Sequence, residues 1–348
     1  MSEKNNQISN GVKKIFIIWG REAELSRWLA KGLGAELKQV YIEKWGKVKL
    51  PVFIRYIAQS IKTLFILLAR KPEAVIVQNP PIFCALTCYF YCTIAGAKLA
   101  IDSHTAAFLD RKWIFFHWLF KFIAKKADLN TCHNFKNLSV LKEWGIEPAM
   151  VIQFYNPVYK EEELKPELKD EKISELLKKS RLPIMMVNRF ACDDDWLTVL
   201  AAAALLPETT FFITGNLPAS LKETLKRNMP RNVCLTGYLP HKEFMKLMWR
   251  CRIILAFTLR KDTVLWSIRE IMALGKPFIT TDSEVLRHYF SEVALFTKSD
   301  PRELKEKIHL ALKNENQIKD KIKIFLEKDR GRWGKEISDA NKILNNKK

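Results

Sequence analysis

Two carboxylates stand close together in the C-terminal half of the sequence. The stretch 261–282 reads KDTVLWSIREIMALGKPFITTD, in which Asp262 lies eight residues before Glu270. The pattern predicts that Glu270 opens a helix, that Gly275 ends it and that a buried strand follows. A carboxylate in the first turn of a helix can accept hydrogen bonds from ribose hydroxyls while the helix N-terminus faces a diphosphate. We therefore expect a nucleotide-diphosphate sugar as ligand.

Polar residues in the N-terminal half also follow predicted strands. The segments VQNPP (77–81) and IDSH (101–104) each stand where a strand meets its loop. Because an imidazole titrates near neutral pH, His104 could act as a base toward an acceptor or bond a donor-sugar hydroxyl. Asp102 would orient or assist it. The alternatives are a structural histidine and a carboxylate that caps the loop.

The elements that position these residues alternate between strand and helix. KKIFIIWG is an apolar run too short for a helix, and the amphipathic ELSRWLAKGL follows it. The same alternation recurs through ADLNTC and restarts at LPIMMVNRF, which predicts doubly wound parallel sheets. Ligands of such α/β sheets bind beyond the carboxyl ends of the strands, so both sets of loops should line a central cleft.

The chain of 348 residues is long enough for two domains. The pattern changes around VIQFYNPVY (151–159), where a short strand meets an Asn-Pro turn and a charged segment follows. We place the domains at 1–155 and 156–348. The helices after Pro301 are the segment that could cross back to the first domain.

The C-terminal motifs resemble glycosyltransferase family 4. The segment Asp262–Pro277 is similar to the family's E-x7-E stretch and the following E-x-M-A-x-G-x-P, with the first acid shortened to Asp. MVNRF, ITGN and LTGYLPHKEF resemble its preceding loops in the same order. The resemblance implies a GT-B fold, two Rossmann-like domains facing a cleft, with Glu270 on the nucleotide ribose. Asp262 would lie near the donor sugar or its leaving phosphate.

The same resemblance implies the other donor-binding residues. Arg189 would face the diphosphate, where a guanidinium neutralises charge as the nucleoside diphosphate leaves. The neighbouring loops would contribute Gly215, Thr236, Gly237 and Tyr238.

The lysine that usually follows the family's arginine has no match here. The segment reads ACDDDW, and Arg260 or Lys261 could supply the second cation. We interpret the aspartates 193–195 as helix capping before Trp196. The alternative is a D-x-D metal site of a different glycosyltransferase fold.

The N-terminal segments VQNPP and IDSH resemble those of the beta-1,4-mannosyltransferase of lipid-linked oligosaccharide assembly. By this resemblance Gly20 and Asn79 face the acceptor, and His104 and Asp102 are catalytic together with Asp262. That relative inverts whereas family 4 retains, so the anomeric outcome stays open.

Charge and cysteine usage limit the partners and the compartment. A net charge of +20 suits anionic lipid, phosphorylated substrates or nucleic acid, but no nucleic-acid-binding motif is present. Seven cysteines without a C-x-x-C pair indicate buried thiols in a reducing cytosol. The polar start MSEKNNQISNGVKK lacks the apolar core of a signal peptide, so we expect a cytoplasmic protein.

Two apolar helices in the first half predict contact with a membrane. Residues 113–126 carry one narrow stripe of His117, Lys121 and Lys125, and residues 51–70 carry a similar polar stripe. Such helices can lie in the headgroup region with lysines on anionic lipid; the alternative is burial against the sheet. The longest apolar stretch, 80–97, opens with two prolines, and we expect a buried helix there.

Together these features predict a glycosyltransferase at the inner face of the membrane. It would move a hexosyl unit from a nucleotide-diphosphate sugar to a hydroxyl of a lipid-linked or polysaccharide acceptor, without a cofactor or bound metal. The alternatives are a non-catalytic relative that binds membranes as a basic subunit and a sugar-nucleotide epimerase.

Overall fold

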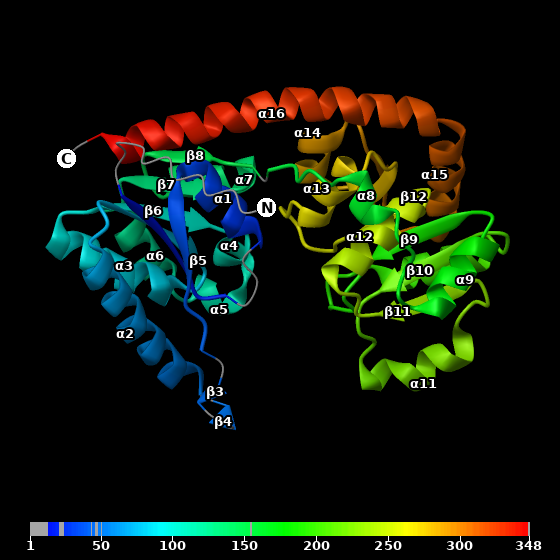
Figure 1. The fold of residues 1–348 in the computed structure, drawn as a ribbon, viewed down its shortest axis with the longest axis horizontal. Coiled ribbons are helices and arrows are strands. Elements are labelled where there is room, and N and C mark those ends of the chain that lie inside the picture. Colours follow the sequence, from blue (N-terminus) through cyan, green and yellow to red (C-terminus); the bar gives the residue numbers. More distant parts are fainter. Residues whose placement is uncertain are drawn as a thin grey trace. The chain divides into compact units, whose positions relative to one another are not determined.

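The computed structural model describes residues 13–20, 24–42, 44–45, 48–49, 51–153 and 155–346. Two compact α/β units make up the chain (Figure 1). The first comprises the described residues up to Tyr155 and those from Arg332 onward, and the second runs from Asn156 to Gly331. Each unit is built around its own six-stranded sheet.

The sheet of the first unit is parallel throughout, in the order β2-β1-β5-β6-β7-β8. Its strands are β1 (Lys14–Ile18), β2 (Ala35–Gln39), β5 (Ala74–Asn79), β6 (Lys98–Ser103), β7 (Leu129–Cys132) and β8 (Ala149–Val151). Ile15 and Ile17 pack into one hydrophobic cluster and Phe16 and Ile18 into another, because successive side chains of a strand point to opposite faces. Both faces of this sheet are therefore covered.

The helices of the first unit connect these strands. They are α1 (Glu24–Leu33), α2 (Val52–Arg70), α3 (Ile82–Ala95), α4 (Ala106–Leu109), α5 (Arg111–Ile114), α6 (His117–Ala124) and α7 (Phe135–Glu143). Gly96 ends α3 in the left-handed conformation that favours glycine. A short antiparallel pair, β3 (Lys44–Trp45) and β4 (Val48–Lys49), precedes α2.

The second unit contains a parallel sheet in the order β11-β10-β9-β12-β13-β14. Its strands are β9 (Pro183–Val187), β10 (Thr210–Thr214), β11 (Val233–Gly237), β12 (Ile253–Ala256), β13 (Phe278–Thr281) and β14 (Leu295–Thr297). The strand order reverses at β9, which pairs with β10 on one side and β12 on the other. Ligand sites of open α/β sheets lie at such a reversal.

The helices of the second unit begin after Tyr159. They are α8 (Glu161–Leu164), α9 (Glu171–Lys179), α10 (Trp196–Ala204), α11 (Ala219–Asn228), α12 (His241–Arg250), α13 (Trp266–Ala273), α14 (Glu284–Phe290) and α15 (Pro301–Lys313). The last helix, α16 (Glu315–Asn345), starts in the second unit and ends in the first. Its final turns place Ile337 and Ala340 in the cluster that contains Phe16.

A buried arginine ties both ends of the second unit to α13. Arg269 is fully buried, and its Nη1 lies 2.7 Å from Asp329 Oδ2 and 3.2 Å from Asn156 Oδ1. Asn156 is the first residue of the unit, and Asp329 lies near its last. Because a buried charge needs a partner, this ion pair fixes α13 against both segments.

Three expectations about local structure are corrected. Glu270 does not open its helix, because α13 begins at Trp266 and the buried face that includes Ile268 extends one turn further back. The single helix expected over 113–126 is broken into α5 and α6, because Phe116 has a non-helical backbone. Not all thiols are buried, since Cys192 is exposed. The expected buried helix in 80–97 is α3, in which seven residues are buried.

Candidate active site

Two arginines meet one carboxylate where the strand order of the second sheet reverses. Arg189 follows β9 and Arg260 follows β12. Asp193 Oδ2 lies 3.5 Å from Arg189 Nη2 and 3.1 Å from Arg260 Nε, while the main-chain oxygen of Asp193 accepts from Leu259 N at 2.7 Å. The arginine side chains are 70% and 41% exposed, so both can reach a ligand. Arg260 thus lies beside Arg189. It is one of the two residues that we expected to replace the family's missing lysine.

The aspartates 193–195 organise this loop rather than cap the helix as expected. Asp194 Oδ2 accepts from the main-chain nitrogens of Arg189 at 2.8 Å and Ala191 at 3.0 Å. Asp195 occupies the N-cap position of α10, but its side chain accepts from the Thr198 hydroxyl at 2.8 Å and caps no main-chain N–H. The capping interpretation is therefore wrong for the side chains.

Gly215 is required by the close approach of two loops. A Cβ at Gly215 would lie 2.5 Å from Asn188 O and 2.9 Å from Arg189 Cα, and the φ of Gly215 is +100°. Thr214 Oγ1 accepts from Asn188 N at 3.0 Å and holds the same loop. The side chain of Asn188 is buried, and its amide has no hydrogen-bond partner within the described part of the chain. Arg189 is therefore positioned by main chain packed against a glycine.

The third loop of this edge contains Thr236, Gly237 and Tyr238. Gly237 O accepts from Gly215 N at 3.0 Å, and Thr236 Oγ1 donates to the same oxygen at 3.0 Å. Gly237 has a φ of +69°, with open space around a would-be Cβ. Tyr238 is 73% exposed. The structure thus brings together Arg189, Gly215 and the third loop, and their donor-binding roles stay predictions.

Glu270 is a buried carboxylate held by two donors. His241 Nε2 lies 2.8 Å from Glu270 Oε1, and the Tyr159 hydroxyl lies 3.4 Å from the same oxygen. Because a carboxylate only accepts, both groups donate to it. The glutamate is 5% exposed, and both donors use Oε1, which leaves Oε2 for a ligand.

Asp262 and Lys261 lie in the loop between β12 and α13. Asp262 adopts a left-handed backbone (φ 54°) and is half-buried, whereas Lys261 is exposed. Neither is in a described contact with Glu270. Their donor-site roles stay predictions.

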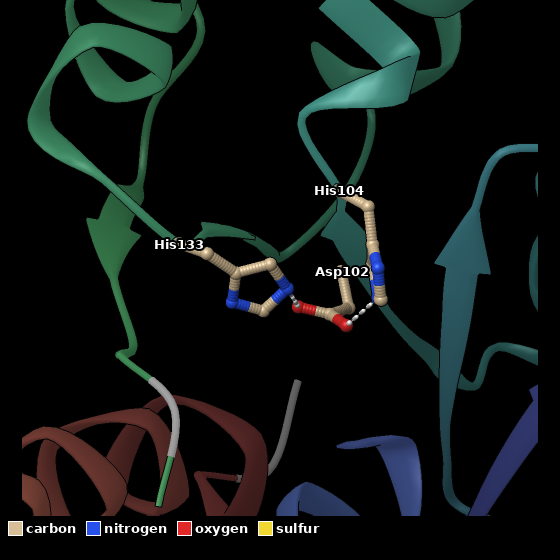
Figure 2. A group of neighbouring side chains, drawn as sticks. All are labelled: Asp102, His104 and His133. Carbon is tan, nitrogen blue, oxygen red and sulfur yellow. Dashed lines mark ion pairs between the residues drawn. The ribbon is translucent and has the colours of Figure 1, made fainter. Parts of the chain in front are cut away.

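Three titratable side chains meet at the carboxyl edge of the first sheet (Figure 2). Asp102 in β6 is 1% exposed; its Oδ2 lies 3.2 Å from His104 Nε2 and its Oδ1 lies 3.5 Å from His133 Nε2. Thr131 donates to Asp102 Oδ1 at 2.8 Å. His133 Nδ1 lies 2.9 Å from Ile152 O, so this nitrogen carries a proton. His133 therefore has an acceptor at both ring nitrogens, which favours its doubly protonated form.

The electrostatics agree with this protonation. Burial would raise the pKa of Asp102, but the charge of His133 and the close approach of both imidazoles outweigh it and hold the pKa far below its ordinary value. Burial would lower the pKa of His133, but the charge of the nearby Asp102 raises it. Burial lowers the pKa of His104, and the nearby His133 charge adds to this. His104 is therefore neutral near pH 7 and can accept a proton.

Asn79 and Gly20 stand at the same edge. The main-chain oxygen of Asn79 accepts from His104 N at 2.8 Å, and its buried amide lies 3.4 Å from Ser103 Oγ. Gly20 follows β1, and its oxygen accepts from Gln39 Nε2 at 2.7 Å. Asn79 thus fixes the backbone of His104, and its acceptor role stays a prediction.

One group of side chains in the described part of the chain has metal-ligand geometry. The ligand atoms of Asp102, His104 and His133 all lie within 4.8 Å of one another. A metal ion would need an unprotonated nitrogen on His133, whereas both nitrogens of His133 face oxygen acceptors. The cluster therefore fits a proton-carrying triad better than a metal site. The aspartates 193–195 form no such group among the described residues.

Residues 168–328 match the family Glycosyl transferases group 1. This stretch contains Arg189, Gly215, Glu270 and the loops that position them. The fold is GT-B, and the C-terminal half of the chain contains a domain that matches group 1 glycosyl transferases. No curated protein matches the sequence significantly.

Solved structures share this fold at low identity. Anabaena HepE in complex with UDP-glucose has a TM-score of 0.69 at 12% identity, covering 94% of this chain and 99% of that one. Sucrose-phosphate synthase from Thermosynechococcus elongatus has a TM-score of 0.69 at 13% identity, covering 94% and 100%. UDP-GlcNAc 2-epimerase from Neisseria meningitidis, bound to UDP-GlcNAc, has a TM-score of 0.60 at 14% identity, covering 89% and 94%. These likenesses show the fold, and the resemblance of the N-terminal half to the mannosyltransferase stays a prediction.

Sequence reasoning missed three residues of the two sites. His133 follows β7 and His241 begins α12, and each lies just beyond the carboxyl end of a predicted strand. That position was a usable signal. Tyr159 had no comparable signal, because its role depends on a contact with Glu270 far along the chain. Asp193 was singled out, but its contact with Arg260 was not predicted.

Proposed function

We propose that this protein transfers a hexosyl unit from a nucleotide-diphosphate sugar to a hydroxyl of a membrane-held acceptor. The group 1 match over the loops that carry Arg189 and Glu270 is the observation that supports this most strongly. Glu270 accepts hydrogen bonds from the ribose hydroxyls. Arg189 and Arg260 bind the diphosphate and stabilise its developing charge as the sugar leaves.

In this proposal His104 is the base that activates the acceptor. Its Nε2 faces Asp102, which leaves Nδ1 as the nitrogen to receive the proton of the acceptor hydroxyl. The acceptor oxygen then bonds to the anomeric carbon, and the sugar–phosphate bond breaks with its electron pair going to the nucleoside diphosphate. Burial and the charge of His133 keep His104 neutral, and Asp102 orients its ring.

The membrane part of the proposal rests on exposed apolar side chains in the first unit. On α2 they are Val52, Phe53, Ile54, Ile57, Ile61, Phe65 and Leu68; on α3, Phe90 and Ile94; around α6, Ile114, Phe115, Trp118 and Phe122. We call this set the apolar face. The helix α3 packs against both α2 and α6, so the three helices are neighbours (Figure 1). Patches of this kind mark interaction sites, and aromatic side chains favour the lipid headgroup region.

The polar residues of α2 also indicate that the apolar side of this helix faces outward. Of the three residues of the predicted stripe, Gln59 is buried, Arg55 is half-buried and Lys62 is exposed. Gln59 and Arg55 therefore point inward, while Phe53 and Phe65 are 73% and 71% exposed. This reverses the arrangement of an ordinary surface helix. By length and composition alone, α2 is also the one described helix that could cross a membrane. We favour a peripheral position at the inner face of the membrane, because Arg55 and Gln59 belong to the interior of a folded unit.

The transfer reaction can be tested with purified protein and a panel of nucleotide sugars. We expect nucleoside diphosphate to be released with one donor, faster when a lipid extract supplies the acceptor, and not with Glu270→Ala. The matched change at exposed Glu284, on α14, should leave release intact. Release of free epimerised sugar without an acceptor would favour the epimerase, and no release with any donor would favour a non-catalytic subunit.

Membrane contact can be tested separately by flotation with vesicles of anionic phospholipid. We expect the wild type to float and Phe65→Glu to stay in solution, because a charge would enter the apolar face. Leu310→Glu, at a position 40% exposed on α15, serves as the control. Equal flotation of both variants would contradict the apolar face as the binding surface.

A further inference from the structure

A cavity of about 200 Å³ opens at the carboxyl edge of the first sheet. Trp19 follows β1, Pro80 follows β5 and Ala106 follows β6, and all three line the cavity. The carboxyl edge of a parallel sheet is where such folds bind ligands. A larger cavity of about 570 Å³ lies at the opposite edge, near Glu73 and Lys98, where β5 and β6 begin. The smaller cavity therefore lies at the same edge of the sheet as Asp102, His104 and His133.

A buried amide in this cavity lacks the partners that buried polar groups ordinarily have. Gln59 is 1% exposed, and neither its Nε2 nor its Oε1 has a hydrogen-bond partner in the described ranges. Arg55, one helical turn earlier, has an unpartnered buried Nε. Because buried donors and acceptors are nearly always satisfied, both groups indicate a ligand. A hydroxyl, which both donates and accepts, matches the two ends of the amide.

Aromatic rings form the walls around Gln59. The rings of Trp19 and Tyr56 lie 5.9 Å apart, and the indole Nε1 of Trp19 donates to Thr63 Oγ1 at 2.9 Å. Trp113 lines the same cavity. With the polar atom of Trp19 already bonded, its ring offers an apolar surface of the kind on which the C–H face of a sugar can pack.

The size and the charges distinguish a neutral sugar from an anion. The cavity is smaller than the roughly 300–1,000 Å³ of pockets for drug-sized ligands, which suits one ring. Arg55 lies 5.8 Å from the ring of Tyr56, and Lys112 lies 5.5 Å from the ring of Trp113, so both cations rest on aromatic faces. Asp110 adds a carboxylate to the lining, which would repel a phosphate but not an uncharged ring.

We propose that this cavity binds one pyranose ring of the acceptor, with the Gln59 amide bonded to its hydroxyls. The assignment rests on the proposed function, which it extends to the class of acceptor. Pro80 and Pro81, which line the cavity, directly follow Asn79, whose main-chain oxygen accepts from His104 N. The outer side of α2 belongs to the apolar face, so one helix would hold the sugar and contact the lipid that carries it.

The direct test is saturation-transfer NMR on the full-length protein without donor. The probes are the methyl α- and β-pyranosides of glucose, mannose and galactose, and N-acetylglucosamine, each at millimolar concentration. We expect at least one to bind, and Gln59→Leu to weaken that binding at least tenfold. The same substitution at Gln317, exposed on α16, should leave it unchanged.

Thermal unfolding separates binding from folding. Leucine at position 59 removes an unpartnered buried amide, so we expect the Tm of Gln59→Leu to equal or exceed that of the wild type. Gln59→Asn keeps the amide but shortens it by one carbon, and should bind with intermediate strength. A marked fall in Tm with Gln59→Leu would show that the amide is structural, and would overturn the assignment.

Three further results would also overturn it. These are no binding by any sugar of the panel, binding that Gln59→Leu leaves intact, and displacement of the sugar by inorganic phosphate at equal concentration. Because no nucleotide is present, these outcomes are independent of the donor site. Failure of the proposed transferase function would instead appear as a lack of nucleoside diphosphate release.

Discussion

Gly215 and Gly237 form a matched pair that tests how the donor loops are built. Both have positive φ, but a Cβ at Gly215 would lie 2.5 Å from Asn188 O, whereas Gly237 has open space. Alanine at 237 should cost about 1–2 kcal/mol of unfolding free energy for the left-handed backbone. Alanine at 215 adds an overpacking cost of about 1–3 kcal/mol, for a total of roughly 2–5 kcal/mol.

The loop that Gly215 contacts also carries Arg189, so the two variants should differ in function as well. We expect Gly215→Ala to weaken donor binding at least tenfold, about 1.4 kcal/mol, because the new Cβ displaces the Arg189 backbone. Gly237→Ala should weaken it by less. Urea unfolding gives the stabilities and titration calorimetry the affinities. Equal losses in both variants would refute the argument that close packing against Gly215 positions Arg189.

Two further substitutions test the two sites. Arg189→Ala should lower kcat about 100-fold, the usual effect of removing one group that stabilises developing charge, and Arg189→Lys should restore part of it. His133→Gln removes the charge that helps to lower the pKa of His104, so this pKa should rise and the acid limb of kcat/KM should move to higher pH. Asp102 and Glu336 raise the pKa of His133 and so keep that charge in place near neutral pH.

Each of these variants has a control elsewhere in its unit. Arg231 is exposed just before β11, at the opposite edge of the second sheet, so Arg231→Ala should leave kcat unchanged. His117 also bonds a main-chain oxygen, with Nε2 3.0 Å from Ala107 O, so His117→Gln should leave the acid limb in place. If the acid limb of kcat/KM stays at its wild-type pH in His133→Gln, then His133 has only a structural role.

The architecture was accessible from the sequence because parallel strands have a simple signature. Runs such as KIFII and PIMMV are buried on both faces, and each precedes a loop with a polar residue. The doubly wound parallel sheets predicted from this alternation are confirmed, and so is the GT-B fold that the family resemblance implied. Helix starts were harder to predict. The buried residues of α13 begin before Glu270, the carboxylate from which its start was predicted.

Residues that follow a strand, such as Arg189 and His104, could be placed at the carboxyl edge of a sheet from the sequence, because the strand signature fixes that position. Their roles stay predictions. Contacts that join distant segments were not accessible, such as Tyr159 to Glu270, because residue spacing carries no information about them. The inward orientation of Gln59 also depends on tertiary packing, since an isolated amphipathic helix would place a glutamine in water.

The most direct test of the central claim is a titration of the protein with UDP, GDP, ADP and CMP and their sugars, for both the wild type and Glu270→Ala. The account predicts that one nucleotide class binds the wild type and raises its Tm by mass action, and that Glu270→Ala loses this effect. The absence of binding by every nucleotide, or binding that Glu270→Ala leaves unchanged, would contradict it.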